Sequence, residues 1–396
     1  MKKVAMIGVG KLGQECAEVM STIYDVVGYD IAPRNPTFPM MNTIKEAVTD
    51  RDIIFIAAPT PHESMYGGET PTSHLPNKDF DYTILTDILN EVNKYVNKNQ
   101  LVVLISTVLP GTVRTILYPC ISNARFVYNP YLIAMGTTKH DMVNPEMVII
   151  GTEDGTATQD CLELVNFYIP LMQNNPRYEL GTWEEAEAIK IFYNTFISTK
   201  VAIANMIQDV AVKVDNMCVD VVTAALQRST QRITSPAYMN AGMGDGGACH
   251  PRDNIALSYL SEKLDLGYDL FDGITRARER QAENLAKTLL TYGKNVTIIG
   301  KAYKSGVPYT HGSSSLLVGY YVDQHGGTVN YYDEHTGDLD LAEDTTDVYL
   351  IGYWDDYVEE LKFSDENIAT VVDPWRRWTT DRCSGHVVHY GNTRKQ

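Results

Sequence analysis

The stretch Lys3-Val4-Ala5-Met6-Ile7-Gly8-Val9-Gly10-Lys11-Leu12-Gly13 decides the fold class of this 396-residue chain. An apolar run of strand length enters a G-x-G-x-x-G turn, and sequence of helical length follows the turn. Gly8 permits a tight turn, Gly10 lets the backbone approach a pyrophosphate, and Gly13 lets the helix pack closely on the strand. The stretch therefore predicts a strand, a turn and a helix that together bind a dinucleotide.

A carboxylate ends the next apolar run. Asp30 closes the segment Val27-Gly28-Tyr29-Asp30, 20 residues after Gly10. A carboxylate at this place hydrogen-bonds the ribose hydroxyls of NAD and disfavours the 2′-phosphate of NADP. We therefore expect NAD as the cofactor, and the expected cofactor-binding residues of this region are Gly8, Val9, Gly10, Leu12, Gly13 and Asp30.

A later part of the chain repeats this beginning. Three pairs of segments correspond in order: Lys3–Gly8 with Asn295–Gly300, Val27–Asp30 with Val329–Asp333, and Asp52–Ile56 with Asp347–Ile351. Short apolar runs separated by stretches of helical length indicate parallel strands with crossover helices. We expect an α/β protein with two doubly wound, Rossmann-like domains.

The segment between the two repeats has a helical pattern. Thr182 and Glu185 form a capping box ahead of an apolar periodicity that predicts one long helix to about Val210. Further helices are expected at 219–227, 254–264 and 268–292. The expected domains are an NAD-binding Rossmann domain, a central helical domain with a subunit interface, and a C-terminal Rossmann-like domain, at 1–180, 181–290 and 291–396.

The composition disfavours several classes of partner. The chain has 33 basic and 50 acidic residues, a net charge of -17, which disfavours nucleic acid or an anionic membrane and requires a local basic pocket for an anionic substrate. The six cysteines lack the paired spacing of zinc sites or disulfide frameworks, so we expect reduced thiols and no metal. No run reaches the length of a membrane span, and the start does not continue as a signal peptide. We expect a soluble cytoplasmic protein.

One cysteine has an unusual setting. The segment Gly246-Gly247-Ala248-Cys249-His250-Pro251-Arg252-Asp253 places a thiol between glycines and a carboxylate. Most cysteines are small buried apolar residues, but glycines that admit a ligand and a nearby charge favour a covalent nucleophile. His250 either lowers the pKa of the thiol or merely covers it. A nucleophilic thiol beside a hydride acceptor predicts oxidation of an alcohol past the aldehyde.

Other polar residues lie where the predicted fold places ligands. Lys190 and Asn194 stand four apart on the predicted long helix and share one face, which is either solvated or lines a cleft. In a cleft, an ammonium and a carboxamide would together stabilise an oxyanion. Thr60 and Thr107 follow the apolar runs 53–57 and 101–105, at the carboxyl ends of predicted strands, where open α/β sheets bind ligands.

Taken together, these motifs resemble those of the UDP-glucose/GDP-mannose dehydrogenase family, in order along nearly the whole chain. The segment around Cys249 resembles the family's glycine-glycine-x-cysteine-phenylalanine-proline-lysine-aspartate. The other matching motifs are Ala186-Glu187 with Lys190 and Asn194, Arg232-Ile233 ahead of Ala241-Gly242, and Ala302-Tyr303-Lys304. The resemblance implies a four-electron oxidation of a nucleotide-sugar C6 alcohol to a carboxylate with two NAD used in turn. UDP-glucose, oxidised to UDP-glucuronate, is the favoured substrate.

The resemblance also implies roles for individual residues. Cys249 would hold the C6 carbon as a thiohemiacetal and then as a thioester, Lys190 and Asn194 would stabilise the oxyanions, and Asp253 and Thr107 would position or activate water. Arg232, reaching into a neighbouring subunit, and Lys304 would bind phosphates. The implied substrate-binding residues are Tyr131, Leu132, Lys190, Asn194, Arg232, Tyr238, Gly246 and Lys304. The family commonly assembles as dimers through the central helix, so we expect a homodimer.

The chain departs from the family pattern in several places. Tyr131 and Met135 stand where the family has two glutamates, and a phenol with a pKa near 10 is a poor base at neutral pH. Water activation would then fall to Asp253. Three further departures are His311 for an arginine, Arg376 near the place of a phosphate-binding arginine, and Arg252 for a lysine.

Two other functions remain open. A two-electron hydroxyacid-type dehydrogenase also uses a lysine and an asparagine one helical turn apart, and it would give Cys249 no role. A nucleotide-sugar or NAD-binding protein with impaired catalysis would explain the loss of acids at Tyr131 and Met135. Replacing Cys249 by serine separates the first alternative from the family reaction, since only the family reaction needs the thiol.

Overall fold

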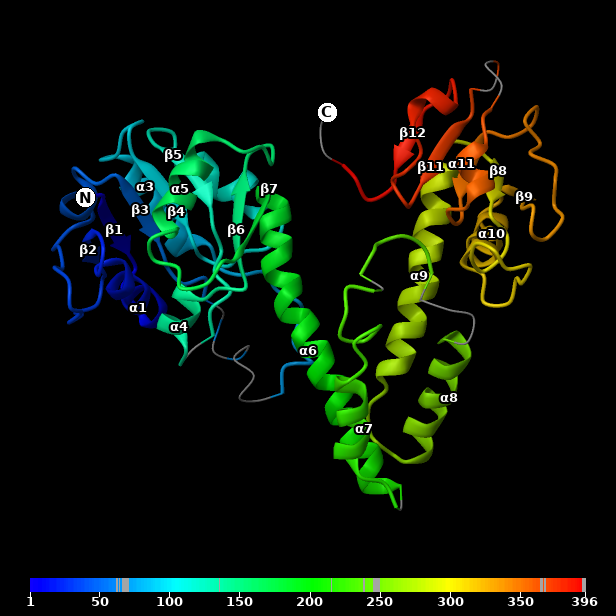
Figure 1. Ribbon diagram of the computed structural model, residues 1–396, viewed down its shortest axis with the longest axis horizontal. Helices are drawn as coiled ribbons and strands as arrows, with labels where there is room; N and C mark the ends of the chain where they lie inside the picture. Colours follow the sequence, from blue (N-terminus) through cyan, green and yellow to red (C-terminus); the bar gives the residue numbers. More distant parts are fainter. Residues whose placement is uncertain are drawn as a thin grey trace. The chain divides into compact units, whose positions relative to one another are not determined.

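The computed structural model describes residues 1–61, 63, 65, 71–134, 136–214, 216–237, 239–244, 250–363, 366 and 368–393 (Figure 1). The chain divides into two compact units, Met1–Val201 and Ala202–Gln396, called here unit 1 and unit 2. Each unit contains one sheet of mostly parallel strands with helices packed on it. This confirms the expected α/β class with two Rossmann-like sheets, whereas the domain boundaries at 180 and 290 stay predictions.

The described strands of unit 1 form a seven-stranded sheet in the order β2-β1-β3-β4-β5-β6-β7. The strands are β1 Lys3–Ile7, β2 Asp25–Tyr29, β3 Ile53–Ile56, β4 Leu101–Leu104, β5 Arg125–Tyr128, β6 Met147–Thr152 and β7 Arg177–Thr182. The helices are α1 Lys11–Met20, α2 Ile44–Val48, α3 Thr83–Asn93, α4 Thr138–Val143 and α5 Gln159–Tyr168, and a π-helical turn covers Val113–Leu117. Helix α6, Trp183–Lys213, begins in unit 1 and ends in unit 2. Neighbouring strands are parallel except β5 and β6, which pair antiparallel.

Both faces of this sheet are buried, which explains why its strands read as continuous apolar runs. In β1, Ala5 and Ile7 face a core closed by α2, α3 and the first turn of α6. Val4 and Met6 face a second core closed by α1, α4 and α5. Because successive side chains of a strand point to opposite faces, a polar residue inside β1 would enter one core or the other.

The register brings several chain turns to the same edge of the sheet. Ile7, at the end of β1, lies opposite Tyr29 at the end of β2 and Ile56 at the end of β3. Ile56 lies in turn opposite Leu104, the last residue of β4. The segments that follow these four strands therefore meet at the carboxyl edge, where open α/β sheets bind ligands.

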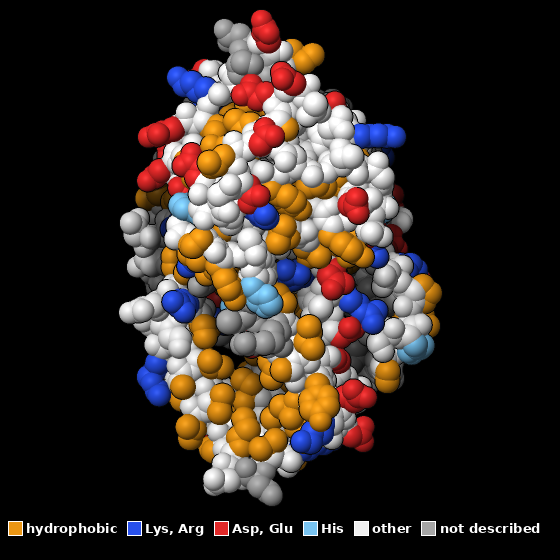
Figure 2. Space-filling model, turned by 90° about the vertical axis from the view of Figure 1, so that its right-hand side faces the viewer, with side chains coloured by type: hydrophobic (Ala, Val, Ile, Leu, Met, Phe, Trp, Pro, Cys, Tyr) orange, Lys and Arg blue, Asp and Glu red, His pale blue; other side chains and the backbone are white. Residues whose placement is uncertain are grey.

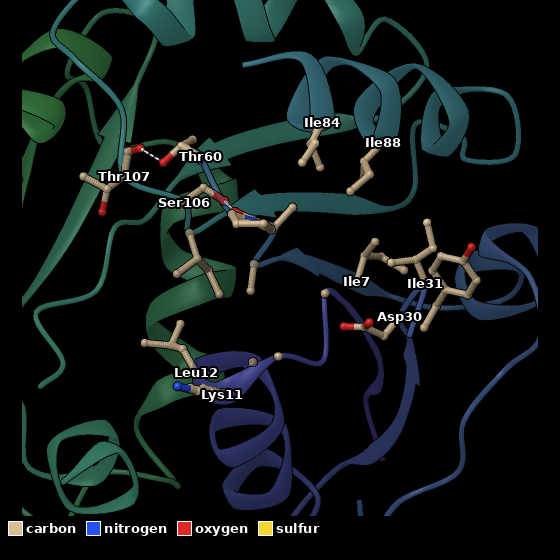
Figure 3. A pocket seen from close by; sticks show the side chains of 18 of the residues that line it. Ile7, Lys11, Leu12, Asp30, Ile31, Thr60, Ile84, Ile88, Ser106 and Thr107 are labelled. Carbon is tan, nitrogen blue, oxygen red and sulfur yellow. Dashed lines mark hydrogen bonds between the residues drawn. The ribbon is translucent and has the colours of Figure 1, made fainter. Parts of the chain in front are cut away.

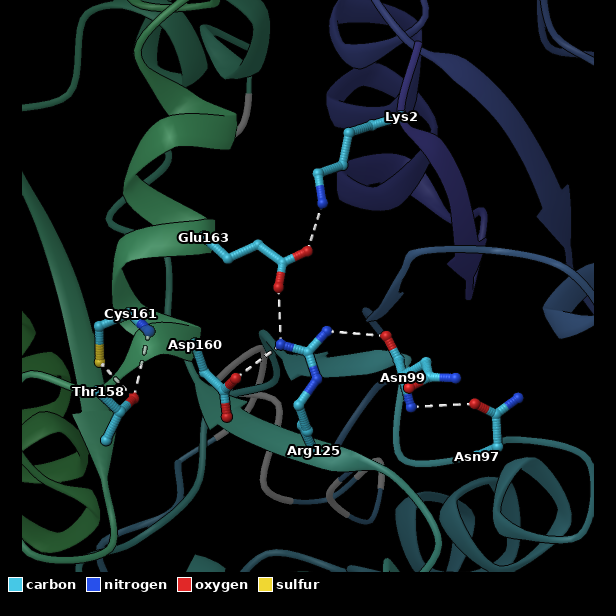
Figure 4. Close-up of polar contacts among 8 residues, drawn as sticks. All are labelled: Lys2, Asn97, Asn99, Arg125, Thr158, Asp160, Cys161 and Glu163. Carbon is cyan, nitrogen blue, oxygen red and sulfur yellow. Dashed lines mark hydrogen bonds and ion pairs between the residues drawn. The ribbon is translucent and has the colours of Figure 1, made fainter.

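The opposite, amino edge of the sheet is held by ion pairs (Figure 4). Arg125, which begins β5, lies 2.6 Å from Asp160 and 2.7 Å from Glu163, both in α5. Lys2, just before β1, also contacts Glu163, and Arg125 donates to the carbonyl of Asn99 before β4. These bonds join three strand beginnings to one helix, at the edge away from the carboxyl ends.

The described strands of unit 2 form a five-stranded sheet in the order β12-β11-β10-β8-β9, and all its pairs are parallel. The strands are β8 Asn295–Ile299, β9 Thr328–Tyr332, β10 Val348–Ile351, β11 Thr370–Asp373 and β12 Val387–His389. The helices are α7 Val219–Gln227, α8 His250–Lys263, α9 Leu270–Leu290, α10 Ser314–Gln324 and α11 Asp356–Glu360. The order β9-β8-β10 repeats β2-β1-β3, which confirms the correspondence of the three pairs of segments.

The first residues of the central helices are set by capping side chains and by a proline. Thr182 and Glu185 form the expected capping box at the start of α6, with each backbone N–H bonded to the other side chain. α8 begins four residues earlier than expected, because Pro251 in its first turn has no N–H to leave unsatisfied. α9 begins at Leu270 because the Asp269 carboxylate caps it by accepting from two backbone N–H groups. Within the described residues, no helix is long and apolar enough to cross a membrane.

Candidate active site

A cavity of about 850 Å³ opens at the carboxyl edge of the unit 1 sheet. Figure 3 shows Asp30 and Ile31 on one side of it, Thr60 and Thr107 on the other, and Lys11 and Leu12 below. Predicted site residues that line it are Gly8, Gly10, Leu12, Gly13, Asp30, Thr60, Thr107, Tyr131 and Lys190. Val9 lies in the same turn, but its side chain is fully buried in the core. The fold thus brings the glycine turn and the lysine of the long helix to one cavity.

The glycine turn has the shape that a pyrophosphate needs. Gly8 has a φ of +93°, and a Cβ on it would lie 2.7 Å from the carbonyl oxygen of Ala57. A Cβ on Gly13 would lie 1.9 Å from the carbonyl oxygen of Gly8, whereas a Cβ on Gly10 would meet nothing within 4 Å. In the part of the chain that the structure describes, no side chain caps α1, so its first N–H groups are available to an anion. The residues present therefore fit the pyrophosphate of NAD.

Asp30 is held in place by its own loop. One carboxylate oxygen, Oδ1, accepts the N–H of Ala32 at 2.8 Å and lies 3.4 Å from Nε of Arg34. Within the described residues, no hydrogen bond occupies the other oxygen, Oδ2. Asp30 and Arg34 both line the cavity, so the free oxygen suits a ribose hydroxyl at this end.

The turns after β3 and β4 are bonded to each other at the far side of the cavity. The Thr60 hydroxyl donates to the carbonyl of Thr107 at 3.0 Å, and the Ser106 hydroxyl donates to the carbonyl of Ala58 at 2.6 Å. Sequence reasoning missed the residue that anchors the second turn to α6. Glu187 is fully buried and accepts the N–H groups of Gly111 and Val113, each at 2.6 Å.

Lys190 follows Glu187 by one helical turn and is 9% exposed. Burial lowers the pKa of its ammonium. Within the described residues no hydrogen bond or ion pair satisfies this ammonium, so the cavity is the place for its partner. Asn194, four residues further along α6, is exposed and does not line the cavity. Four residues advance the helix by about 6 Å, so Lys190 can reach the cavity while Asn194, on the same face of the helix, lies beyond it.

Tyr131 lines the cavity but directs its hydroxyl into the core. Its hydroxyl lies 2.7 Å from the Tyr168 hydroxyl, which donates to Oδ1 of Asn129 at 2.5 Å. Burial raises the pKa of Tyr131 well above the ordinary value. The phenol therefore stays neutral and cannot act as the base that the family places here. Leu132 is partly buried and packs against the core that contains Ala5 and Ile7, and Met135 lies outside the described residues.

The predicted catalytic cysteine, Cys249, lies outside the described residues, as do Gly246 and Tyr238. Asp253 is exposed in the first turn of α8, and Arg232 and Lys304 are also exposed. The Lys304 ammonium lies 5.4 Å from the centre of the Tyr303 ring, a cation–π contact. These described residues all belong to unit 2.

Arg376 holds the segment that leads to Cys249. Its guanidinium donates to the carbonyl of Ala241 at 2.7 Å and to that of Tyr390 at 3.1 Å. Gly242 packs on the ring of Trp375, since a Cβ there would lie 2.2 Å from Cζ3 of the indole. In this structure the arginine binds backbone carbonyls, and a phosphate would have to compete with them.

The second repeat lacks the free carboxylate of the first. Asp333 corresponds to Asp30, but it is fully buried and all its donors come from the protein. One oxygen accepts the N–H of Ala302 at 2.7 Å and the Tyr353 hydroxyl at 2.9 Å, and the other accepts the N–H groups of His335 and Thr336. Of these two corresponding carboxylates, Asp30 therefore has an oxygen available to a ribose and Asp333 does not. Among the described residues, no cluster of side chains could hold a metal ion.

Known proteins resemble this chain in sequence and in fold. Residues 33–169 match the NAD binding domain of the UDP-glucose/GDP-mannose dehydrogenase family, and residues 184–279 match its central domain, together more than half of the chain. The UDP-glucose 6-dehydrogenase of Rickettsia prowazekii is 27% identical over 258 residues, 63% of this chain and only 58% of that protein. The GDP-mannose 6-dehydrogenase of Pseudomonas putida is 25% identical over 388 residues, 86% of this chain and 84% of that protein.

A solved structure shares the fold. The crystal structure of a ternary complex of GDP-mannose dehydrogenase from Pseudomonas aeruginosa matches with a TM-score of 0.79 at 21% identity, covering 96% of this chain and 99% of that one. At this identity the likeness concerns the fold alone.

Proposed function

The chain belongs to the UDP-glucose/GDP-mannose dehydrogenase family, and we propose that it oxidises the C6 alcohol of a nucleotide sugar to the uronate with NAD. UDP-glucose, giving UDP-glucuronate, is the favoured substrate. The observation that carries the proposal is the unit 1 cavity, which Asp30 and Gly10 line together with Thr107 and Lys190. One cavity thus offers both a cofactor-binding turn and a buried ammonium that has no partner among the described residues.

Each group in the cavity has a task in this reaction. Asp30 and the N–H groups at the start of α1 would hold the adenosine ribose and the pyrophosphate of NAD. The bound cofactor would supply the hydride acceptor for the C6 carbon. Burial lowers the pKa of Lys190, which makes its proton easier to transfer to the reacting oxygen, and its charged form stabilises an oxyanion there.

The remaining steps are assigned to the cysteine loop. The first oxidation removes a hydride and the hydroxyl proton and leaves an aldehyde. The Cys249 thiol adds across its carbonyl to give a thiohemiacetal, which loses a second hydride and a proton to become a thioester. Water, positioned by Asp253, cleaves the C–S bond, and this step yields the carboxylate and restores the thiol. Asn194, Arg232, Tyr238, Gly246 and Lys304 are proposed to hold the sugar and its phosphates.

The experiment counts NADH released per sugar consumed. Purified protein is incubated with NAD and, in separate reactions, with UDP-glucose, GDP-mannose and an N-acetylated UDP sugar. We expect two NADH per sugar with one of them, and we expect Cys249→Ser to stop after the first oxidation. A yield of one with free aldehyde, or full turnover by Cys249→Ser, would contradict the proposal and favour the two-electron dehydrogenase.

A second candidate rests on Tyr131. Its neutral phenol points into the core, so no carboxylate stands at this place to help hydrolyse a thioester. A protein that binds NAD and a nucleotide sugar but turns over slowly would have this property. Tight binding of both ligands in calorimetry, with an acyl-enzyme that accumulates or with no NADH at all, would favour this candidate.

We further propose a homodimer. In α6, Phe192, Phe196 and Val201 are all more than half exposed, as are Val221 in α7 and Ile255 in α8. Figure 2 shows hydrophobic side chains gathered in the lower part of one face, at the height of α7 and α8 in Figure 1. Large exposed apolar areas mark interaction surfaces. Light scattering that gives the mass of one chain at micromolar concentration would refute the dimer.

A further inference from the structure

Glu187 is a buried carboxylate that the proposed reaction does not use. Its side chain is fully buried in α6, and each of its two oxygens accepts one backbone N–H at 2.6 Å, Oε2 from Gly111 and Oε1 from Val113. Gly111 belongs to the turn that follows β4 and contains Ser106 and Thr107, and Val113 begins the π-helical turn directly after it. The acceptor and the donors are more than seventy residues apart in the chain.

Burying a carboxylate costs several kcal/mol unless hydrogen bonds compensate, so an apolar side chain would be the simpler filling for this place. Two charge-assisted bonds to neighbouring amides do what an apolar residue cannot. They fix two points of a loop relative to a rigid helix. Within the described residues, no other side chain accepts from the N–H of Gly111 or Val113.

The two ends of this connection both reach the cavity. Thr107 lines it from the loop, and Lys190 lines it from α6, one turn beyond Glu187. We propose that Glu187 is a positioning residue that sets the placement of Thr107 relative to Lys190. It thereby sets the geometry of hydride transfer at the end of the cavity away from Asp30, which is called here the nicotinamide end. The inference rests on the proposed function for its rate measurements but not for its binding measurements.

The surroundings of Glu187 make this connection sensitive to pH. Among the described residues, the titratable groups that face it are Glu184 on the same helix, Arg114 in the π-helical turn and Tyr128 in β5. Burial raises the pKa of Glu187 to about 7, against the opposing effect of its two N–H donors. Protonation places a hydrogen on one oxygen and removes an acceptor from one N–H. The connection is therefore complete above pH 7 and loosens as the pH falls below it.

The decisive variant is Glu187→Gln, which keeps the shape but turns one acceptor into an NH₂ donor that faces an N–H. The matched control is Glu184→Gln, which makes the same change one turn earlier in α6. Glu184 pairs with Arg114, and both side chains are more than one-third exposed, so loss of this pair has a small effect. Glu187→Asp is the second variant, because it keeps the charge but is too short to reach both amides.

We measure kcat, the KM for NAD, the Kd for ADP as the adenosine half of the cofactor, and the apo melting temperature. We expect Glu187→Gln to lower kcat by about 10- to 100-fold, as misplacement by about 1 Å does, while the Kd for ADP changes less than about two-fold. The wild type should lose activity as the pH falls below about 7, and Glu187→Gln should not show this loss. Glu184→Gln should keep kcat and the same type of pH dependence, shifted to slightly lower pH because the charge of Glu184 helps to raise the pKa of Glu187. Equal losses in Glu187→Gln and Glu184→Gln, or an unchanged kcat in a folded Glu187→Gln or Glu187→Asp, would overturn the proposal.

NADH binding separates this inference from the proposed function. If the wild-type protein binds NADH but oxidises no nucleotide sugar, the proposed function fails while Glu187 can still be judged. The fluorescence of bound NADH reports the nicotinamide end, so Glu187→Gln should reduce its enhancement and leave the Kd for ADP unchanged. Identical NADH fluorescence in the wild type and both Glu187 variants would overturn the inference by itself.

Discussion

Two glycines of one turn should respond in opposite ways to the same added methyl group. A Cβ on Gly13 would lie 1.9 Å from the carbonyl oxygen of Gly8. This oxygen belongs to the backbone, so it can be displaced only if β1 or α1 moves. A Cβ on Gly10 would meet nothing within 4 Å, and the φ of Gly10, -77°, is allowed for alanine. Gly13→Ala should therefore damage the fold, and Gly10→Ala should damage cofactor binding alone.

The magnitudes follow from these contacts. Overpacking of a backbone contact costs about 1–3 kcal/mol, and the higher helix propensity of alanine offsets up to about 1 kcal/mol of it. For a unit of this size, each remaining kcal/mol lowers the melting temperature by about 2–4 °C. For Gly10→Ala, the smaller entropy of the unfolded chain gains about 0.4–1 kcal/mol, and the poorer helix cap loses a similar amount. Its apo melting temperature should stay within about 2 °C of the wild type.

The assay is thermal unfolding with and without saturating NADH, with affinity measured by calorimetry. The methyl of Gly10→Ala enters the space that the pyrophosphate approaches, so we expect at least a roughly 10-fold weaker Kd, about 1.4 kcal/mol. The rise in melting temperature on adding NADH should shrink accordingly. If Gly10→Ala unfolds as early as Gly13→Ala without ligand, or keeps the full NADH effect, our account of this turn is wrong.

Three further predictions concern single residues. Asp30→Ser removes the ribose acceptor and releases Arg34, so the ratio of NADP to NAD affinity should rise about 10-fold or more, and an unchanged ratio would refute the assignment. Tyr131→Phe removes the hydroxyl bonded to Tyr168 and should lower the free energy of unfolding by about 1 kcal/mol. Because the pKa of Tyr131 is raised well above its ordinary value, the pH–rate profile between 6 and 9 should not change, and a lost limb would count against a neutral phenol. Titration calorimetry should find one NADH per chain, because protein donors occupy both oxygens of Asp333 and leave none for a second ribose. Two sites of similar affinity would contradict this prediction.

The sequence predicted the features whose causes are local. The strand, turn and helix around Gly10 follow from a motif of a few residues, and the capping box of Thr182 needs only its own neighbourhood. The order β9-β8-β10 could be anticipated because the corresponding segments repeat the beginning of the chain. In each case the short-range pattern and the final contacts agree, which is the condition for reading structure from sequence.

Features that depend on distant contacts could not be predicted in this way. Glu187 stood in a family motif, but no local pattern indicates that two amides seventy residues away would meet its carboxylate. The helical spacing of Lys190 and Asn194 gives a shared face, not how far the cavity extends along it. The direction of the Tyr131 hydroxyl depends on Tyr168, and the bonds of Arg376 depend on Ala241. These partners are distant in the chain and become neighbours only in the folded structure.

The different bonding of Asp30 and Asp333 also determines how each position tolerates change. Both oxygens of Asp333 accept hydrogen bonds from the protein, whereas Asp30 keeps one oxygen for a ligand. In a saturation mutagenesis library, substitutions at 333 should register as low abundance, and those at 30 as normal abundance with little turnover. Substitutions at two corresponding positions of the repeats would then differ in effect: those at 333 would lower the expression level, and those at 30 would lower the activity per molecule.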